Sequence, residues 1–259
     1  ISDSAQRETR ISRLFDRLTL NKQIPFILND SVAFLYNGAA TSVSWAGDFN
    51  GWNSQSADYQ GTKLGLSKIF RVTKTFPHDA RLDYKIVLNG NSWILDQLNS
   101  YQQYSGFGPN SELRMPGWIN PPETVPGNDV LKGVISDNIR IVSRSENLNY
   151  SVQYKVYTPY NYQESTNLDV IFVTDGHEYA DDRLGAMKTV LDNLIFQNQI
   201  PPVIAVFVDP RNPDNLGQNR RMTEYTGSMR YARFLAQELV PCIDTTYRTN
   251  PTPEHRAIL

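Results

Sequence analysis

The sequence is short of the residues that mark several classes of protein. It has one cysteine, Cys242, so an internal disulfide framework is excluded. Lys and Arg together number 25 and Asp and Glu 27, without basic clusters, which argues against nucleic acid as a partner. No apolar run approaches the roughly 20 residues that span a bilayer, so we expect no membrane partner.

The remaining composition is that of an ordinary globular chain. Its 259 residues suffice for a large core and for two domains. Cys242 lies in the apolar helical pattern "FLAQELVPCI" and is expected to be a small buried core residue. The chain begins with Ile1 and lacks an initiator Met, so a removed signal peptide and trimming are both open. The localisation is therefore unknown, with secretion or a bacterial periplasm among the alternatives.

The N-terminal half carries the patterns of one helix and of many short strands. Residues 1–23 are expected to form an N-terminal helix, because apolar residues recur at helical spacing at Ile11, Leu14, Phe15 and Leu18. Residues 24–114 alternate short runs rich in Val, Ile, Tyr, Phe and Trp with turn residues, which predicts an antiparallel β-sandwich. Asn89-Gly90 predicts a tight hairpin turn within it.

The C-terminal half changes character after a proline-rich segment. Residues 115–129 contain four prolines and are interpreted as a linker. In residues 130–259 we expect buried strands alternating with helices, hence a parallel sheet flanked by helices. The expected elements are an antiparallel edge strand within 149–159, buried strands within 168–176 and 201–210, helices over 184–199 and 228–247, and a third buried strand that begins in "HRAIL".

Six ordered segments of the second half resemble one enzyme family. They are "YKVYTPYNY", "DVIFVTDGHEY", "IPPVIAVFVD", "NRRMTEY", "FLAQELVPCIDTTYRT" and "HRAIL". Together, over about residues 148–259, they resemble the first half of an esterase-D-type α/β-hydrolase domain. That group includes enterochelin (ferric-siderophore) esterases and feruloyl esterases. The resemblance implies a serine acyl-transfer mechanism that needs no cofactor and no metal.

The same resemblance implies that the catalytic triad would follow Leu259. In this fold the strand at "HRAIL" leads into the nucleophile elbow G-x-S-x-G, and the order is Ser, then Asp or Glu, then His. No G-x-S-x-G occurs in the sequence, and neither His78 nor His255 suits a triad base. We therefore expect the chain alone to be inactive and truncated relative to a natural protein. An exposed strand edge would then favour self-association.

The loop after the first buried strand resembles the one that supplies half of the oxyanion hole in this family. Gly176 would permit a tight turn, and the backbone N–H of His177 would point at the developing oxyanion. The alternative is a plain turn with an exposed His177. The acidic residues around it lack a metal-ligand spacing, and a solvated helix N-terminus explains them better.

A second loop, "NRRMTEY", matches one that borders the cleft of similar esterases. From it Arg221, Glu224 and Tyr225 are candidate substrate-binding residues, with Arg221 suited to an anionic group and Tyr225 to an aromatic acyl group. A solvated loop with local ion pairs is the equal alternative. Asp209, at the end of the strand before this loop, is expected to cap a turn.

The first half resembles the immunoglobulin-like module of glycogen- and starch-binding proteins. The resemblance is carried by "WAGDFNGWN" (45–53) and "YKIVLNGNSWILDQLN" (84–99). By motif position it implies that Trp52, Lys85 and Trp93 would grip a sugar, the rings by stacking and the amine by hydrogen bonds. In an esterase we rather expect the two tryptophans to pack the sandwich or an interface.

Two classes of function follow from these resemblances. The first is a carboxylic-ester hydrolase acting on a siderophore, a feruloylated polysaccharide or a small acyl ester. The second is a non-catalytic carbohydrate-binding or scaffold protein with glucan or xylan as a partner. The presence of G-x-S-x-G in any longer form of the protein would discriminate between them.

Overall fold

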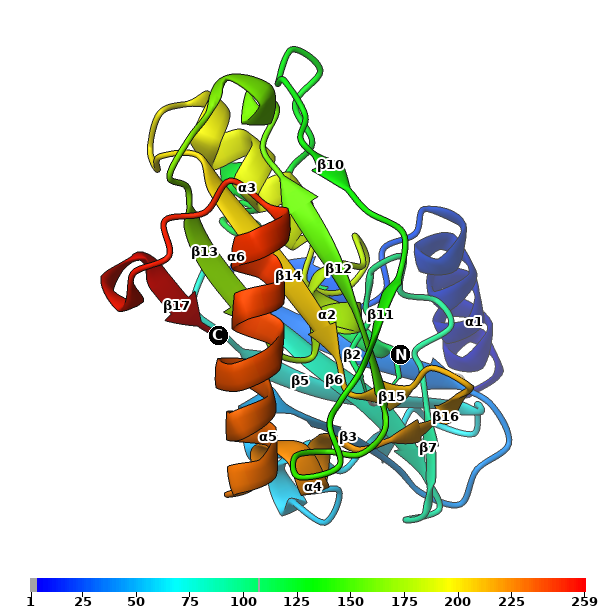
Figure 1. Ribbon diagram of the computed structural model, residues 1–259. Coiled ribbons are helices and arrows are strands. Elements are labelled where there is room, and N and C mark those ends of the chain that lie inside the picture. Colours follow the sequence, from blue (N-terminus) through cyan, green and yellow to red (C-terminus); the bar gives the residue numbers. More distant parts are fainter. Residues whose placement is uncertain (1–3, 107) are drawn as a thin grey trace. The chain divides into compact units, whose positions relative to one another are not determined.

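A computed structural model describes residues 4–106 and 108–259. The chain divides into two compact units, residues 1–119 (unit 1) and residues 120–259 (unit 2). Figure 1 labels most of their helices and strands. In the described part of the chain, no helix combines the length and the hydropathy that a membrane span requires.

Unit 1 begins with helix α1, Ser4–Leu20, as its apolar spacing predicts. Phe15 and Leu18 are buried against Leu35 and Ile69. Leu14 was expected on the same face, yet it is 47% exposed. At about 100° per residue it lies at the margin of the apolar stripe, which is too narrow to cover it.

Two antiparallel sheets form the rest of unit 1. The first has the order β1-β2-β5-β4 and the second β3-β6-β9-β8, with β7 paired to β6. The strands are β1 Phe26–Leu28, β2 Ser31–Asn37, β3 Val43–Gly47, β4 Thr62–Lys63, β5 Ile69–Thr75, β6 Arg81–Leu88, β7 Ser92–Ile94, β8 Gln102–Gln103 and β9 Asn110–Arg114. Short 3-10 helices η1 Asp48–Asn50 and η2 Ala57–Tyr59 lie between β3 and β4.

Aromatic side chains from both sheets share one core in unit 1. Phe34 of β2 meets Tyr84 of β6 edge-on, with ring centroids 5.0 Å apart, and Trp45 of β3 at 6.1 Å. All three side chains are fully buried. Two antiparallel sheets around one core are what the alternating strand pattern predicts. The immunoglobulin-like topology stays a prediction.

The hairpin predicted at Asn89-Gly90 is confirmed. It joins β6 to β7, and both residues have left-handed backbone, with φ of 53° and 77°. The N–H of Asn91 donates to the carbonyl of Leu88 at 3.2 Å, which closes the turn. Two consecutive positive φ values are the conformation that Asn-Gly tolerates at low cost.

The proline-rich segment 115–129 contains the division between the units, at residues 119 and 120. Its second half is held by helix α3, Met187–Phe196. The side-chain amide of Asn193 donates to the carbonyls of Glu123, in the 3-10 helix η3 Pro122–Thr124, and of Val125, at 2.7 and 2.9 Å. This part of the segment therefore has a fixed conformation on unit 2.

Unit 2 is built on one mixed sheet. The strands are β10 Val134–Ile135, β11 Ile139–Val142, β12 Ser151–Thr158, β13 Asp169–Val173, β14 Val203–Asp209 and β17 Arg256–Ile258. The order is β10-β12-β14-β13-β17, with β11 also on β12. Strand β13 is parallel to β14 and to β17, whereas β12 is antiparallel to β14. All seven residues of β14 are buried, as its unbroken apolar run predicts.

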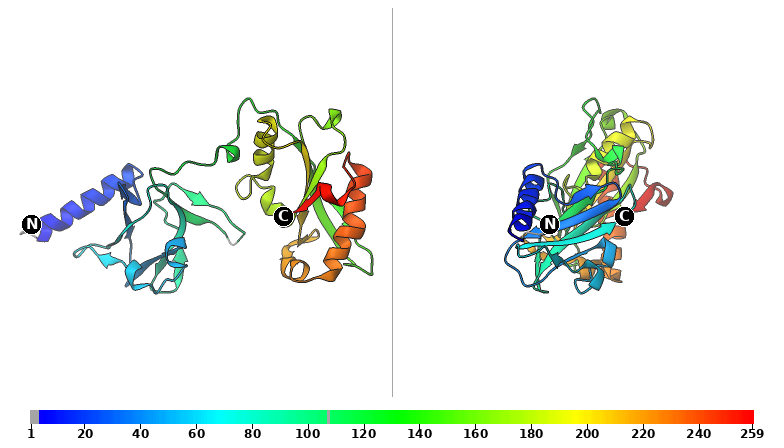
Figure 2. Two further views of the ribbon diagram at one scale, coloured as in Figure 1. Left: turned by 90° about the vertical axis from the view of Figure 1, so that its left-hand side faces the viewer. Right: turned by 180° about the vertical axis from the view of Figure 1, so that it is seen from behind.

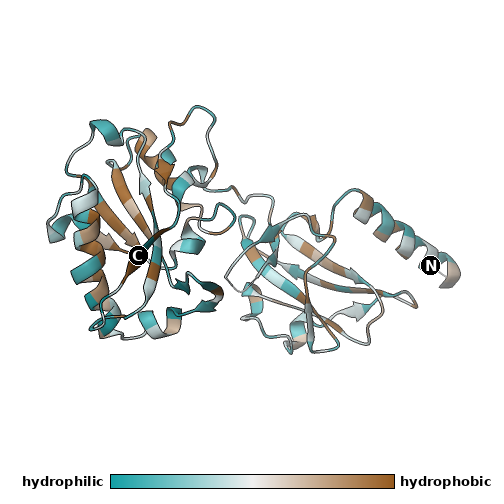
Figure 3. Ribbon diagram, turned by 45° about the vertical axis from the view of Figure 1, so that its right-hand side comes forward, coloured by the Kyte–Doolittle hydropathy of each residue, from teal (hydrophilic) through white to brown (hydrophobic). Residues whose placement is uncertain are grey.

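Helices cover both faces of this sheet. Helix α3 packs on one face, where Leu191 and Ile195 meet Phe207 of β14, and the helical segment from α5 to α6 packs on the other. Figure 2 (left) shows these helices on opposite sides of the strands, and Figure 3 shows the apolar strands between them. The remaining elements are helices α2 Gly176–Tyr179, α4 Arg221–Tyr225, α5 Met229–Phe234 and α6 Val240–Thr246, the π-helical turn η5 Leu235–Leu239, 3-10 helices η4 Tyr162–Glu164 and η6 Pro253–His255, and the hairpin β15 Arg211–Asn212 with β16 Asn215–Asn219.

Three expectations for unit 2 were wrong. Strand β12 is not at an edge, because β10 and β11, which the sequence analysis left unassigned, pair with its outer side. Strand β17 is parallel to β13 as expected but is not buried, and Ile258 is 65% exposed. Cys242 is half-buried on α6, because it lies beside the inward-facing Ile243 and not on the same stripe.

Candidate active site

The chain turns sharply after β13, through Thr174, Asp175 and Gly176. Asp175 has left-handed backbone, with φ of 49° and ψ of 35°, and Gly176 then begins α2. A Cβ atom at Gly176 would lie 2.2 Å from the carbonyl carbon of Phe207 and 2.4 Å from the nitrogen of Val208. Both are backbone atoms of β14, so only glycine allows this close approach.

The turn leaves two backbone donors at the carboxyl end of β13. Gly176 and His177 are the first residues of α2, and the first N–H groups of a helix have no partner within it. Within residues 4–106 and 108–259, no acceptor takes up either N–H group. Ligands of open α/β sheets bind at this end of the strands. The geometry suits an oxyanion donor, and that role for His177 stays a prediction.

The imidazole of His177 lies between two carboxylates. Its Nδ1 lies 3.4 Å from Oδ1 of Asp209, and its Nε2 lies 3.6 Å from Oε1 of Glu178. The side chain is only 14% exposed, not the exposed loop residue of the alternative reading. Burial lowers the pKa of His177, against the opposing effect of the Asp209 carboxylate. The ring is therefore neutral near pH 7.

Asp209 joins β14 to the loop that follows it. Its Oδ1 accepts from the backbone N–H of Arg211 at 2.9 Å, so it caps the turn as expected. Its Oδ2 accepts from Nη2 of Arg211 at 2.8 Å and from the amide of Gln153 at 2.7 Å. Burial acts to raise the pKa of Asp209, but the hydrogen bonds from Arg211 outweigh it and lower the pKa. The sequence analysis missed Gln153, although a buried polar residue within an apolar strand was a usable signal.

Two residues of the predicted substrate loop hold the turn at Asp175. The Nε of Arg221 donates to Oδ2 of Asp175 at 2.7 Å. The backbone N–H of Asp175 donates to the hydroxyl of Tyr225 at 2.9 Å. The structure therefore brings Arg221 and Tyr225 together with the turn that precedes His177. Their proximity makes α4 a support for that turn.

The third predicted residue of this loop, Glu224, faces the interior. It is 3% exposed, and its Oε1 accepts from the hydroxyl of Tyr150 at 2.7 Å. Its Oε2 is buried without a hydrogen-bond partner in the described structure. Burial raises the pKa of Glu224, although the Tyr150 hydrogen bond acts against that rise. Glu224 is therefore a buried acid and not an exposed residue of a solvated loop.

An apolar pocket of about 570 Å³ lies at the carboxyl ends of β13 and β17. Tyr225, Tyr231 and Leu235 contribute to its walls, and Leu259 lies on its β17 side. The carbonyl of Leu259 accepts from both the N–H and the hydroxyl of Thr174, at 2.8 and 2.7 Å. This volume falls within the range of small-molecule sites, and its lining suits an apolar acyl group.

The acidic residues around α2 do not form a metal site in the described structure. There, no group of three or more His, Cys, Asp and Glu side chains is arranged to bind a metal ion. Asp175 pairs with Arg221, and Asp181 pairs with Arg183 at 3.1 Å. These carboxylates are thus compensated by neighbouring guanidinium groups.

The candidate sugar-binding residues of unit 1 lie outside its core. Trp93, on β7, is 44% exposed and pairs with Val87 of β6. Lys85 lies two residues before Val87 on β6 and is half-buried. Trp52 is half-buried, and its Nε1 donates to Asp48 at 3.0 Å. The buried tryptophan of the sandwich core is Trp45. Of the two expectations for Trp52 and Trp93, packing in the sandwich core was therefore wrong, and packing at an interface stays a prediction.

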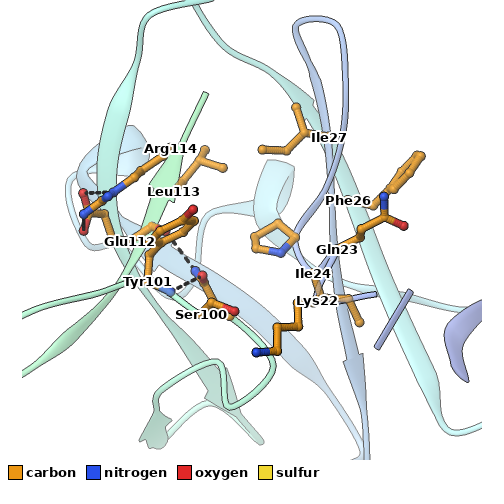
Figure 4. A pocket seen from close by; sticks show the side chains of 12 residues that line it. Lys22, Gln23, Ile24, Phe26, Ile27, Ser100, Tyr101, Glu112, Leu113 and Arg114 are labelled. Atoms are coloured by element: carbon orange, nitrogen blue, oxygen red, sulfur yellow. Dashed lines mark hydrogen bonds and ion pairs between the residues drawn. The ribbon is translucent and has the colours of Figure 1, made fainter. Parts of the chain in front are cut away.

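A pocket of about 220 Å³ in unit 1 lies away from these three residues (Figure 4). Tyr101, Glu112 and Arg114 line one side of it, and residues 24–27 line the other. The Arg114 guanidinium lies 4.4 Å from the Tyr101 ring centroid and donates twice to Glu112, at 2.9 and 3.0 Å. Its arginine is thus already engaged by a carboxylate and a ring.

Comparison with known proteins agrees with this architecture. Residues 145–259 match a family described as "Putative esterase". An uncharacterized protein of Bacillus subtilis, YjcH, is 33% identical over 105 residues, which are 40% of this chain and 42% of that protein. The enterobactin esterase FES from Shigella flexneri matches with a TM-score of 0.65 and 18% identity, over 89% of this chain and 64% of that one.

A second solved structure gives the same result. The ferric enterobactin esterase from Salmonella typhimurium matches with a TM-score of 0.66 and 15% identity, over 87% of this chain and 64% of that one. At these identities the likeness shows the fold. Residues 145–259 match the esterase family model, and the chain shares its fold with these two enterobactin esterases. The chain spans less than two thirds of the length of these relatives.

Proposed function

We propose that this chain is part of a carboxylic-ester hydrolase that works by serine acyl transfer. The observation that carries the proposal is the turn after β13. In the described residues two of its N–H groups have no acceptor, and Thr174 at the start of the turn lines an apolar pocket. In the reaction, a serine attacks the ester carbonyl, and a histidine takes the serine's proton and returns it to the leaving alcohol. Water then hydrolyses the acyl-enzyme by the same route.

Residues of this chain would stabilise the oxyanion of the intermediate and position the acyl group. Backbone N–H groups of Gly176 and His177 would donate to the oxygen that becomes negative in the tetrahedral intermediate. One such donor stabilises the transition state by about 3 kcal/mol. Arg221 and Tyr225 would keep the turn in place through Asp175. The apolar pocket would receive the acyl chain.

The sequence of 259 residues contains no G-x-S-x-G segment. In the proposed enzyme the Ser-Asp/Glu-His triad belongs to sequence that follows Leu259, because the family order places the elbow directly after this strand. Without a nucleophile, the donors and binding groups leave roughly 10³–10⁴-fold acceleration over water. Residues 1–259 alone are therefore expected to show no useful turnover.

A fluorophosphonate probe tests this proposal, since it labels only an activated serine. Recombinant residues 1–259 should not be labelled. The natural protein that contains this sequence, captured with an antibody against unit 1, should be labelled at one serine within G-x-S-x-G. Competition by a p-nitrophenyl ester should protect that serine. Absence of labelling on the natural protein would refute the proposal.

The substrate in this proposal is an ester of a siderophore, a feruloylated polysaccharide or a small acyl group. Enterobactin esterases are among the solved structures with the same fold. Parallel assays with a catecholate ester, a feruloyl ester and p-nitrophenyl acetate on the natural protein would separate the three. The acyl group with the highest kcat/KM identifies the class.

A second candidate function is glucan or xylan binding by unit 1, favoured by the exposed indole of Trp93. Affinity electrophoresis in gels that contain either polysaccharide tests it. Retardation that Trp93→Ala removes, with unchanged unfolding, would support binding. Equal mobility of both proteins would exclude a role for this ring. A non-catalytic scaffold remains only if both tests fail.

A further inference from the structure

We propose that Lys155 and the pocket around it form a binding site for a small oxyanion, a carboxylate or a phosphate, carried by a ligand that reaches the turn at Gly176. The pocket has a volume of about 290 Å³ and lies next to α2. Its lining includes Asn138, Lys155, His177, Asp181, Asp209 and Arg211. A volume near the lower end of ligand sites suits a small group.

The alternation of β12 directs Lys155 to this pocket. Gln153, two residues earlier, binds Asp209, and Tyr157, two residues later, donates to Asp192 at 2.9 Å. Residues two apart on a strand share a face. Lys155 thus lies between two side chains that are both engaged on the α2–α3 face of the sheet, and it is half-buried there.

Among the charged residues that line the pocket, Lys155 lacks an oppositely charged partner in the described structure. Asp209 is paired with Arg211 at 2.8 Å, and Asp181 with Arg183 at 3.1 Å. Lys188 on α3, by contrast with Lys155, is paired with Asp192 at 2.6 Å. Lys155 has no ion pair or side-chain hydrogen bond within the described residues. A half-buried ammonium that lacks an acceptor gains most from an anionic ligand.

The groups next to Lys155 restrict the class of ligand further. Arg211 engages Asp209 through Nε and Nη2, and Nη1 takes no part in that pairing. The ammonium and the guanidinium disfavour a metal cation, whereas both suit oxygen atoms of an anion. Gly176 and His177, whose N–H groups have no acceptor in the described residues, line the same pocket at the turn. A ligand with an anionic group in this pocket and a carbonyl at the turn would use both features.

The assignment of this anion to an ester substrate rests on the proposed function, whereas binding itself requires no hydrolysis. Three small molecules, tested for binding to residues 1–259, separate anion binding from the assignment of the anion to an ester substrate. They are monomethyl succinate, dimethyl succinate and acetate. The first carries an ester and a carboxylate, the second has lost the charge, and the third has only the charge. Amide chemical shifts of Gly176 and His177 in ¹H–¹⁵N spectra at low salt report binding and its location.

We expect monomethyl succinate to bind at least tenfold more tightly than dimethyl succinate. Lys155→Met should remove that difference, whereas Lys155→Arg should retain it within threefold, and Lys63→Met, at an exposed lysine of unit 1, should have no effect. Acetate that binds as tightly as monomethyl succinate would assign the site to a free anion and overturn only the ester assignment.

The proposal is overturned if the two succinates bind equally, if the difference survives Lys155→Met, or if no probe shifts these amides at 50 mM. Should Lys155→Met fail to fold, Lys155→Gln keeps the test intact, because it also removes the charge. Fluorophosphonate labelling of the natural protein is independent of all these outcomes. Failure of the esterase proposal and failure of the anion site are thus distinguishable.

Discussion

A methyl group added at Gly176 would occupy space that the backbone of β14 already fills. The Cβ atom of Gly176→Ala would lie 2.2 Å from a carbonyl carbon and 2.4 Å from an amide nitrogen. Overpacking in a core typically costs about 1–3 kcal/mol. Because backbone atoms of a fully buried strand cannot rotate away, we expect the upper end, about 3 kcal/mol. With a urea slope of about 2 kcal/mol/M, the midpoint of unit 2 falls by about 1.5 M.

The four tryptophans make this measurement specific to one unit. All of them lie within residues 1–119, so tryptophan fluorescence follows the unfolding of unit 1. Far-UV circular dichroism follows both units. Gly176→Ala should shift the dichroism transition of unit 2 and leave the fluorescence transition unchanged.

Gly217→Ala, in the exposed β16, is the matched control. Its added Cβ would have Asn215 Oδ1, at 3.4 Å, as its nearest neighbour, which is an ordinary contact. Its midpoint should stay within about 0.3 M of the parent, equivalent to about 0.6 kcal/mol. A Gly176→Ala shift as small as that of the control would refute the packing argument for the turn.

Three further predictions concern charge and the segment between the units. An NMR titration of His177 should give a pKa below the ordinary value of about 6.5, because burial lowers it. Asp209→Asn should lower this pKa further, because it removes the carboxylate that acts against the effect of burial. A higher pKa of His177 in that variant would contradict the prediction. The raised pKa of Glu224 means that unit 2 is stabilised below the unfolded value of about 4.3 and loses that stability as pH rises through the folded pKa. Urea unfolding from pH 4 to 8 should show this loss in the parent and not in Glu224→Gln, and equal pH profiles would exclude it. Asn193→Ala leaves two carbonyls without their donor and should lower the unfolding free energy of unit 2 by about 1–3 kcal/mol. Gln197→Ala, at the exposed residue that follows α3, is the control.

Local patterns in the sequence predicted much of the secondary structure. The spacing of Ile11, Leu14, Phe15 and Leu18 predicted α1, and Asn89-Gly90 predicted the hairpin. Both depend on backbone geometry within a few residues. The unbroken run at residues 203–209 predicted a strand buried on both faces. In each case the physical cause lies inside the segment itself.

The pairing of strands that are distant in the chain could not be predicted from such local patterns. Strands β10 and β11 are short, and their partner β12 is identified only once the sheet has formed. The position of β12 inside the sheet therefore followed from contacts across the fold. A strand's own sequence does not state which neighbours its edges receive.

The candidate site shows the same division. Gly176 and His177 were singled out because their loop, at a strand's carboxyl end, resembles the oxyanion loop of the esterase family. Only the tertiary structure decided that Glu224 is buried and that Lys155 lacks the anionic partner that Lys188 has. Burial and charge compensation depend on residues far apart in the chain, and folding alone brings those residues within a few ångströms.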